Sequence, residues 1–197
     1  MAKIKQLSPH EAQKIAAGEV VERPANIVKE LLENAIDAQA QQINLYIKDG
    51  GKQLIRVVDT GFGMDHDDAQ RCFLKHATSK IEHIDQLETI NTFGFRGEAL
   101  ASIAAVSKIT LVTKEADTHE GTKLYLEDGQ VQKKEIVSHV TGTDISITEL
   151  FYNIPARKKF LKKNQTELRN IQQLFHAFCF DYPSIHFKLF SEDKLII

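Results

Sequence analysis

The sequence predicts an α+β fold, in which a sheet carries helices on one face. Three observations support this class. Segments with helical character occur near both ends and in the middle of the chain, and four strand-like stretches follow one another between residues 108 and 148. Two dipeptides that favour hairpin turns separate neighbouring strands. Helices and runs of antiparallel strands therefore share one chain.

The first predicted helix begins at a capping box. Residues 8–11 have the sequence Ser-Pro-His-Glu, with proline at the first helical position. Gly18 is expected to end this short helix. A second helix is predicted from Pro24 to about Ala38.

Strands and helices follow in the first half of the chain. A strand is predicted from Gln42 to Lys48, and Gly50-Gly51 should turn the chain into a second strand from Gln53 to Val58. Helices are predicted at Asp67–His76 and at Gly97–Val106, the latter because it is rich in Ala and Leu.

The second half should contain four strands and a long helix. Asp128-Gly129 is a hairpin signal between the second and third of these strands, and the helix is predicted over about Gln165–Phe180. Residues 188–197 have the pattern of a strand, a hairpin turn and an apolar restart, so we expect the chain to be a fragment of a longer protein. The four strands are expected at Lys108–Thr113, Thr122–Leu126, Val131–Val137 and Thr143–Thr148.

Composition and charge exclude several classes of protein. The 197 residues are 42% hydrophobic, which suits one or two globular domains and argues against disorder. A formal charge of −2 excludes a globally basic nucleic-acid binder, although not a local basic patch. The longest nearly apolar run, residues 99–106, is far shorter than a membrane span of about 20 residues, and no secretory signal follows Met1. We therefore expect a soluble, cytoplasmic protein.

Cysteine and histidine spacing argues against a disulfide and against zinc. Cys72 and Cys179 are far apart and form no C-x-x-C motif, which is typical of free thiols in a reducing compartment. None of the eight histidines belongs to an H-x-x-x-H pair or lies at zinc-ligand spacing from a cysteine.

The helix predicted at residues 24–38 carries an acidic stripe. Glu30, Glu33, Asn34 and Asp37 stand at i, i+3, i+4 and i+7, opposite the apolar face and within about 100° of the helical wheel. Like charges at this spacing cost about 0.2–0.5 kcal/mol each, and no lysine stands among them. A solvated face is the simpler interpretation, but the same groups suit a general base and a Mg²⁺ ligand.

Two glycine-rich turns add weaker signals. Asp59, Gly61 and Gly63 form a D-x-G-x-G turn after a strand, which lets backbone pass close to a ligand, although ordinary turns use the same residues. Residues 92–97, Thr-Phe-Gly-Phe-Arg-Gly, precede a helix whose free N–H groups would suit phosphate, or would simply form a flexible N-cap. P-loop, Rossmann and nucleophile-elbow motifs are absent.

In their order and residues these motifs resemble one family, the N-terminal ATPase domain of MutL-type DNA mismatch-repair proteins. The domain's relatives include the ATPase domains of gyrase B, the ninety-kilodalton heat-shock chaperones and histidine kinases. The resemblance covers nearly the whole chain, so residues 1–197 are expected to form one ATPase domain. It implies a Bergerat fold, a two-layer α/β sandwich with a mixed, mostly antiparallel sheet that holds ATP against the helices. The segments that carry it are IAAGEVVERP at 15–24, HATSK at 76–80, GFRGEAL at 94–100 and FYNIPAR at 151–157.

The resemblance implies catalytic and metal-binding roles for the acidic stripe. Glu30 would be the general base that activates the water attacking the γ-phosphate. Asn34 would bind Mg²⁺ beside the triphosphate, with Glu33 and Asp37 supporting the site.

The resemblance also implies contacts to the base and the phosphates. Asp59 would accept a hydrogen bond from the adenine amino group, with Thr143 in support, and Gly61 and Gly63 would let the base approach. The residues implied for a mobile lid and for closure over the phosphates are Thr78, Lys80, Gly94, Phe95, Arg96, Gly97, Glu98, Ala99 and Leu100.

The expected function is therefore a slow, Mg²⁺-dependent ATPase that acts as a conformational switch in mismatch repair. ATP would order the lid and the N-terminal segment, and two copies would then associate. The expected partners are ATP, a second copy, mismatch-recognition and downstream repair proteins and, weakly through the full-length protein, DNA.

Two alternatives stay open. The chain could bind nucleotide without useful catalysis, because the resemblance implies a lysine on the γ-phosphate that comes from a following domain. It could also be a DNA-binding scaffold, since residues 151–173 contain six basic side chains and one acidic one, although a solvated basic face would have the same composition.

Overall fold

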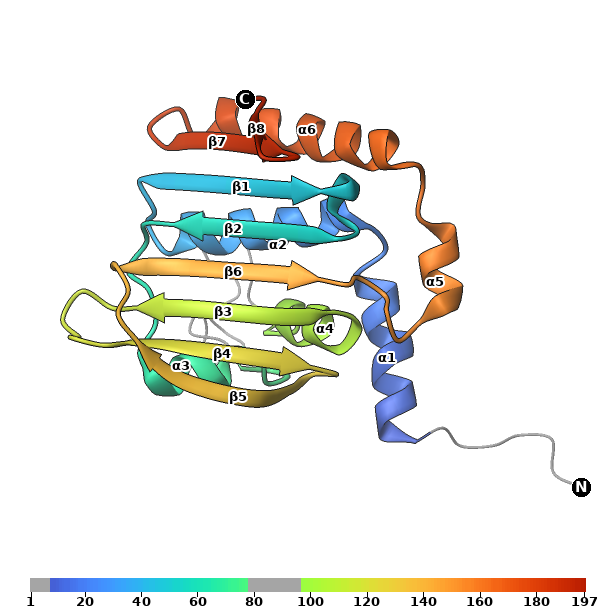
Figure 1. The fold of residues 1–197 in the computed structure, drawn as a ribbon, viewed down its shortest axis with the longest axis horizontal. Helices are drawn as coiled ribbons and strands as arrows, with labels where there is room; N and C mark the ends of the chain where they lie inside the picture. The colour runs from blue at the N-terminus through green and yellow to red at the C-terminus, as the bar shows by residue number, and fades with distance from the viewer. Residues whose placement is uncertain (1–7, 78–96) are drawn as a thin grey trace, which may run out of the picture.

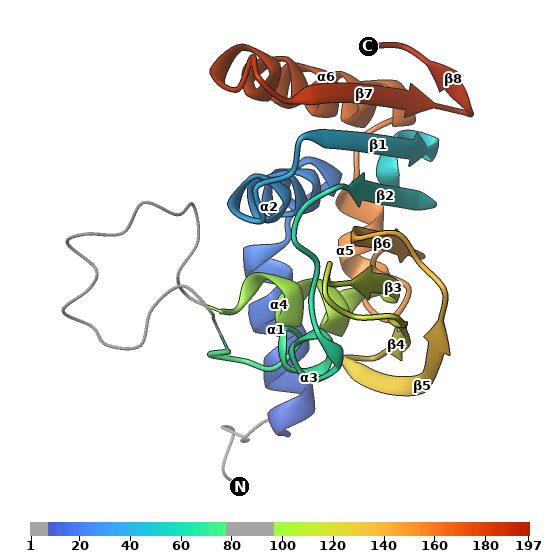
Figure 2. The ribbon, with the colours of Figure 1, turned by 90° about the vertical axis from the view of Figure 1, so that its left-hand side faces the viewer.

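The computed structural model describes residues 8–77 and 97–197. They form two layers, with an eight-stranded sheet in one and helices packed on one face of that sheet in the other (Figures 1 and 2). The strand order is β5-β4-β3-β6-β2-β1-β7-β8. Among the described strands, β1 and β7 pair in parallel and the other neighbours are antiparallel. The predicted α+β sandwich with a mixed, mostly antiparallel sheet is confirmed.

Two helices open the described chain. Helix α1 spans Pro9–Val20, and its predicted capping box is present. The prediction that Gly18 ends this helix is wrong. Gly18 keeps a helical backbone, and its missing side chain makes room for Arg157, whose Nε would lie 3.1 Å from an added Cβ. Helix α2 spans Pro24–Asp37 and buries one face completely, as its apolar periodicity predicts.

The next segment forms the predicted hairpin. Strand β1, Gln42–Lys48, and strand β2, Leu54–Asp59, pair in antiparallel register. The turn is a short 3₁₀ helix, η1, at Asp49–Gly51, in which Gly50 and Gly51 have φ of +63° and +89°. Positive φ is what glycine tolerates, so the pair closes the hairpin without strain.

Both helices predicted in the middle of the chain are shorter than expected. Helix α3 spans His66–Arg71 and not the predicted Asp67–His76. His76 has a φ of +62°, and its N–H donates to the carbonyl oxygen of Gly97 at 3.0 Å, so this backbone bonds to another segment. Helix α4, Ala99–Val106, begins two residues late because Gly97 has a φ of +59°.

The four predicted strands of the second half are confirmed. Asp128 and Gly129 have φ of +56° and +74°, the signs that a two-residue hairpin turn requires. These strands are β3 at Lys108–Lys114, β4 at Gly121–Glu127, β5 at Gln130–Val137 and β6 at Gly142–Thr148.

The C-terminal part contains one unpredicted helix. Helix α5, Pro155–Phe160, buries none of its residues, so its sequence has no apolar periodicity to predict it. Helix α6, Asn164–Asp181, packs beside α2, and strands β7, His186–Ser191, and β8, Lys194–Leu195, form the expected hairpin. None of the described helices is long and apolar enough to span a bilayer.

The core lies between the sheet and the helices that cover it. It combines the apolar face of α2, the inward residues of the central strands and aromatic rings from α6. Its largest fully buried side chains include Ile27, Leu32, Ile43, Ile55, Leu111, Ile147 and Phe175. This core fixes α2 against β1 and β2, which positions the acidic stripe beside the end of β2.

Candidate functional site

Asp59 is a buried carboxylate at the end of β2. It is 7% exposed, and its Oδ1 accepts a hydrogen bond from the N–H of Gly61 at 2.8 Å. Burial raises the pKa of Asp59 to about 6, although hydrogen bonds from the backbone of Gly61 and Thr143 oppose that rise. At neutral pH the side chain is therefore mostly an ionised acceptor on the helix-covered face of the sheet.

The D-x-G-x-G turn is held against the ends of α2 and β3. The N–H of Phe62 donates to the carbonyl oxygen of Ala38 at 3.0 Å. A Cβ on Gly61 would lie 2.7 Å from that oxygen, and one on Gly63 would lie 2.1 Å from the carbonyl oxygen of Lys114. Both glycines are thus required for close approach between protein segments. Their predicted contact with an adenine ring stays a prediction.

Asp59 begins a row of polar residues that crosses four strands. Asp59 pairs in register with Thr143, Thr143 with Thr113, and Thr113 with Thr122. His66, at the start of α3, completes the row, because its Nδ1 lies 3.1 Å from the Thr122 hydroxyl. The sequence predicted a role for the first two of these residues only.

Thr113 is the buried centre of this row. Its side chain is fully buried, and its hydroxyl contacts the N–H of Met64 at 2.9 Å, the carbonyl oxygen of Gly142 at 3.1 Å and the hydroxyl of Thr143 at 3.1 Å. Thr113 was not predicted as a site residue. Its position in the strand could have indicated it. Every second residue of β3 is buried, and Thr113 follows the apolar Ile109 and Leu111 in that series as a polar residue.

The acidic stripe is confirmed on α2, and one of its residues forms an ion pair. Lys29 Nζ lies 2.8 Å from Glu33 Oε1, so Glu33 has a lysine partner from outside the four residues of the stripe. Glu33 is 7% exposed, and a buried carboxylate is costly unless it is paired. Glu30, Asn34 and Asp37 are half-buried, and Asp37 precedes the residue that contacts the glycine-rich turn. Along the helix axis, Glu30 lies about 10 Å from Asp37, toward the N-terminus of α2.

The N-terminus of α4 lies beside α1. Glu98 is its N-cap residue and makes no side-chain cap, and its Oε1 lies 3.2 Å from His76 Nδ1. A hollow of about 160 Å³ separates this end from α1, and Ala17 and Ser102 are among its lining residues. Of the residues predicted to contact phosphate, Gly97, Glu98, Ala99 and Leu100 are described here, whereas Thr78, Lys80, Gly94, Phe95 and Arg96 lie outside the described residues.

The side chains of the acidic stripe could supply only a few of the ligands that a metal ion needs. Within residues 8–77 and 97–197, no group of three His, Cys, Asp or Glu side chains could hold a metal ion. Asn34 offers a single amide oxygen on the same helix face as Glu30. Mg²⁺ takes few protein ligands and completes its shell with phosphate and water oxygens, so this arrangement fits Mg²⁺ bound together with a nucleotide and not alone.

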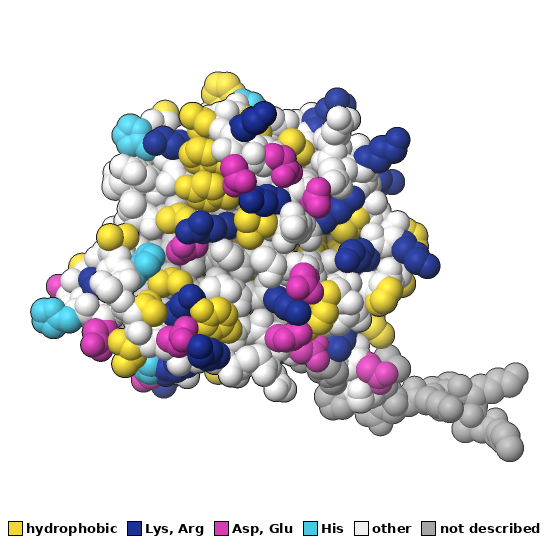
Figure 3. Space-filling model, viewed as in Figure 1, with side chains coloured by type: hydrophobic (Ala, Val, Ile, Leu, Met, Phe, Trp, Pro, Cys, Tyr) yellow, Lys and Arg dark blue, Asp and Glu magenta, His cyan; other side chains and the backbone are white. Residues whose placement is uncertain are grey.

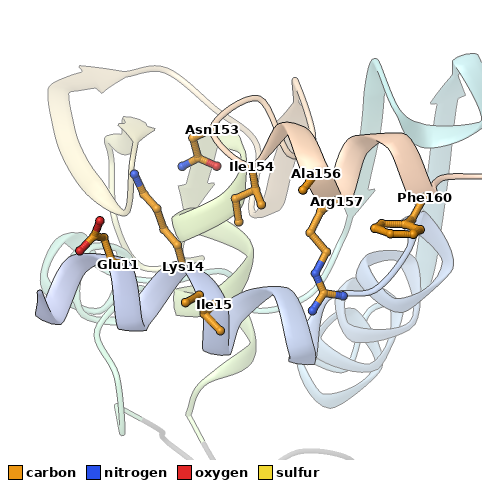
Figure 4. Close-up of a pocket in the computed structure, with 8 residues that line it drawn as sticks. All are labelled: Glu11, Lys14, Ile15, Asn153, Ile154, Ala156, Arg157 and Phe160. Atoms are coloured by element: carbon orange, nitrogen blue, oxygen red, sulfur yellow. The ribbon is translucent and has the colours of Figure 1, made fainter. Parts of the chain in front are cut away.

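A separate groove lies between α1 and α5. It has a volume of about 390 Å³, and Ile15, Ile154, Arg157 and Phe160 line it with residues from both helices (Figure 4). No member of the Asp59 row contributes to it. Lys and Arg side chains gather at the adjoining edge of the molecule, where α5 lies (Figure 3). Five of the six basic residues in the predicted segment are exposed, namely Lys158, Lys159, Lys162, Lys163 and Arg169.

Comparisons with known proteins agree with these motifs. A family model described as histidine kinase-, DNA gyrase B-, and HSP90-like ATPase matches residues 22–155. The chain is 50% identical over 194 residues to the DNA mismatch repair protein MutL of Pelodictyon phaeoclathratiforme, covering 98% of this chain and 31% of that protein. It is 48% identical over 197 residues to MutL of Staphylococcus carnosus, covering 100% of this chain and 30% of that protein.

Solved structures give the same result. The Aquifex aeolicus MutL ATPase domain complexed with ADP superposes with a TM-score of 0.74 at 32% identity, covering 90% of this chain and 63% of that one. The N-terminal domain of a DNA repair protein superposes with a TM-score of 0.79 at 29% identity, covering 94% of this chain and 55% of that one. The chain spans about a third of the length of the MutL proteins that it matches.

Proposed function

The chain belongs to the histidine kinase-, DNA gyrase B- and HSP90-like ATPase family, and from this membership we propose that it binds and slowly hydrolyses ATP with Mg²⁺. The resemblance to the MutL ATPase domain, which four sequence motifs indicated, is confirmed by similarity along nearly the whole chain. We propose further that the chain acts as the ATPase part of a mismatch-repair protein. The solved relative described as complexed with ADP supports a nucleotide as the ligand.

The observation that carries this proposal is the buried Asp59 carboxylate. An ionised acceptor held by Gly61 at the end of β2 suits an exocyclic amino group, which adenine presents at its position 6. Thr143 lies directly beside Asp59 in the register of β2 and β6 and would support the same edge of the base. A guanine base presents a carbonyl oxygen there and would face the Asp59 carboxylate, which can only accept when ionised.

The stripe on α2 would then lie along the triphosphate. The distance of about 10 Å between Asp37 and Glu30 along the helix suits a nucleotide whose base lies at Asp59 and whose phosphates point toward Glu30. Glu30 would accept the proton of the water whose oxygen attacks the γ-phosphorus as ADP leaves. Asn34 would hold Mg²⁺, which supplies charge neutralisation of the phosphates when bound.

The conformational part of the proposal concerns the N-terminus of α4 and the predicted lid. Gly97, Glu98, Ala99 and Leu100 form a helix start whose N–H groups suit phosphate, and the remaining predicted lid residues are Thr78, Lys80, Gly94, Phe95 and Arg96. We propose that ATP closes this lid, orders the N-terminal segment and promotes association of two copies, together with mismatch-recognition and downstream repair proteins. DNA contact through Lys158 and Lys159 belongs to the full-length protein.

A thermal-shift experiment tests the nucleotide assignment. ATP with Mg²⁺ and ADP should raise the melting temperature of the chain, and GTP should not, because ligands that bind only the folded state stabilise it. Equal stabilisation by GTP would refute the assignment of Asp59.

If ATP binds without any phosphate release, the alternative of a nucleotide-binding module without useful catalysis holds. Salt-sensitive DNA binding without nucleotide would support the scaffold alternative.

A further inference from the structure

The buried hydroxyl of Thr113 is placed where a hydroxyl needs partners. Its neighbours along β3 on the same face, Ile109 and Leu111, are apolar and buried. A hydroxyl at such a position is costly unless hydrogen bonds satisfy it. The structure provides three partners, namely the N–H of Met64, the carbonyl oxygen of Gly142 and the hydroxyl of Thr143.

The number of partners fixes the direction of each hydrogen bond. A hydroxyl has one proton to donate and two lone pairs that accept. The Met64 N–H can only donate and the Gly142 carbonyl can only accept. All three contacts are satisfied together when Thr113 donates to Gly142 and accepts from both Met64 and Thr143. In that arrangement the single proton of Thr143 points toward Thr113.

This hydrogen-bond arrangement determines what the Thr143 hydroxyl can offer at the proposed nucleotide site. Because its proton is committed to Thr113, the Thr143 hydroxyl offers only lone pairs to other neighbours. Thr143 is half-buried and stands beside Asp59, whose carboxylate is also an acceptor. Two acceptors side by side favour a base edge that donates, and they disfavour a base edge that carries a carbonyl oxygen.

We propose that Thr113 is a positioning residue that selects the nucleobase, by holding the Thr143 hydroxyl as an acceptor toward the purine 6-position. This proposal rests on the proposed ATP site. It adds a residue that touches no nucleotide. It also assigns Thr113 a second task, since the Met64 hydrogen bond attaches the D-x-G-x-G turn to β3.

The test compares dissociation constants for ATP and for inosine triphosphate, each with Mg²⁺. The two nucleotides differ at the purine 6-position, where inosine carries a carbonyl oxygen, and in the proton that inosine then carries on the adjacent ring nitrogen. In Thr113→Val the Thr143 hydroxyl is free to turn and donate to that carbonyl. The preference for ATP over inosine triphosphate should fall by up to about tenfold, which is the size of one hydrogen bond. If the variant only loosened the turn, the affinities for both nucleotides would fall equally.

Three further variants keep the outcome decisive. Thr113→Ser keeps the hydroxyl and should keep the wild-type preference. Thr113→Cys replaces the oxygen that accepts from Thr143 with sulfur, a weak acceptor, and should lower the preference even if the valine variant fails to fold. Thr110→Val is the matched control, because Thr110 lies on the opposite face of β3, and it should leave the preference unchanged. An unchanged preference in the valine and cysteine variants would overturn the proposal. If the wild-type chain binds neither nucleotide, the ATP site itself is wrong and this role of Thr113 falls with it.

Discussion

Arg56 and Asp144 form an ion pair across β2 and β6 with two hydrogen bonds, of 2.9 Å from Nε and 2.6 Å from Nη2. The pair lies on the open face of the sheet, behind Asp59 and Thr143, which occupy the other face of the same two strands. The Arg56 guanidinium also lies 5.4 Å from the centre of the Tyr46 ring. The two strands that carry the proposed adenine contacts are therefore held together by side chains as well as by backbone.

Loss of this pair should destabilise the sheet at the site. For Arg56→Gln we expect the free energy of unfolding to fall by about 1–2 kcal/mol, because Asp144 is largely buried and would lose two charged hydrogen bonds. Urea unfolding measures the change. Lys133→Gln is the control, since it breaks an exposed pair with Glu135 and should cost less than about 0.5 kcal/mol. Equal effects of the two variants would contradict the role assigned to Arg56.

Removal of the Asp59 charge should raise the stability of the chain and weaken its binding of ATP. The folded-state pKa of about 6 lies above the ordinary value of 3.8, so the ionised carboxylate costs stability at pH 7. We expect Asp59→Asn to be more stable than the wild type by about 1–3 kcal/mol at pH 7 and to bind ATP at least tenfold more weakly, since one acceptor becomes a donor. The stability gain should vanish as the pH falls from 6 toward 4. A variant that binds ATP normally would refute the adenine contact.

Nucleotide affinity should depend on pH through the same group. The proposed adenine contact requires the ionised form of Asp59, whose pKa is about 6 in the free protein. Affinity for ATP should therefore be constant above pH 7 and should fall by up to about tenfold for each pH unit below 6. Calorimetric titration between pH 5 and pH 8 measures this slope. ATP's own phosphates titrate near this range, so ADP and the Asp59→Asn variant serve as references, and identical slopes in variant and wild type would exclude Asp59 as the source.

Hydrolysis should depend on Glu30 more than on its neighbour Glu33. Glu30→Gln should keep ATP binding and lower phosphate release by about 10²–10⁴-fold, as expected when a general base is removed. Glu33→Gln is the matched control. Glu33 already pairs with Lys29, so this change should alter stability more than turnover. Turnover measured in the full-length protein decides the matter, and wild-type rates in Glu30→Gln would remove Glu30 from the mechanism.

The sequence predicted the parts of this fold that depend on local signals. Strand β1 has the predicted bounds, and Asp128 and Gly129 have the positive φ that their hairpin signal requires. Prediction from the sequence failed where contacts with a distant segment determine the local structure. Gly18 was expected to end a helix but accommodates Arg157, and His76 was expected in a helix but bonds through its backbone to Gly97.

The candidate site shows the same division. Motif spacing indicated Asp59 and the stripe on α2, because these residues carry their pattern within a few positions. The salt bridge at Glu33 was missed although Lys29 is only four residues away, because Lys29 lies at the flank of the stripe. Thr113 was missed because its partners come from Met64, Gly142 and Thr143, which only the folded sheet brings together.

The parallel pairing of β1 with β7 has a consequence for synthesis on the ribosome. Each β1 residue pairs with a residue about 140 positions later, whereas the partners of Asp59 on β6 emerge much earlier. At ordinary translation rates, one edge of β1 would wait unpaired for on the order of ten seconds after it is made. The strands that carry the proposed adenine contacts can pair before that edge is closed. A nucleotide bound at this stage would stabilise the unfinished sheet by mass action, so cellular ATP could assist the folding of its own binding domain.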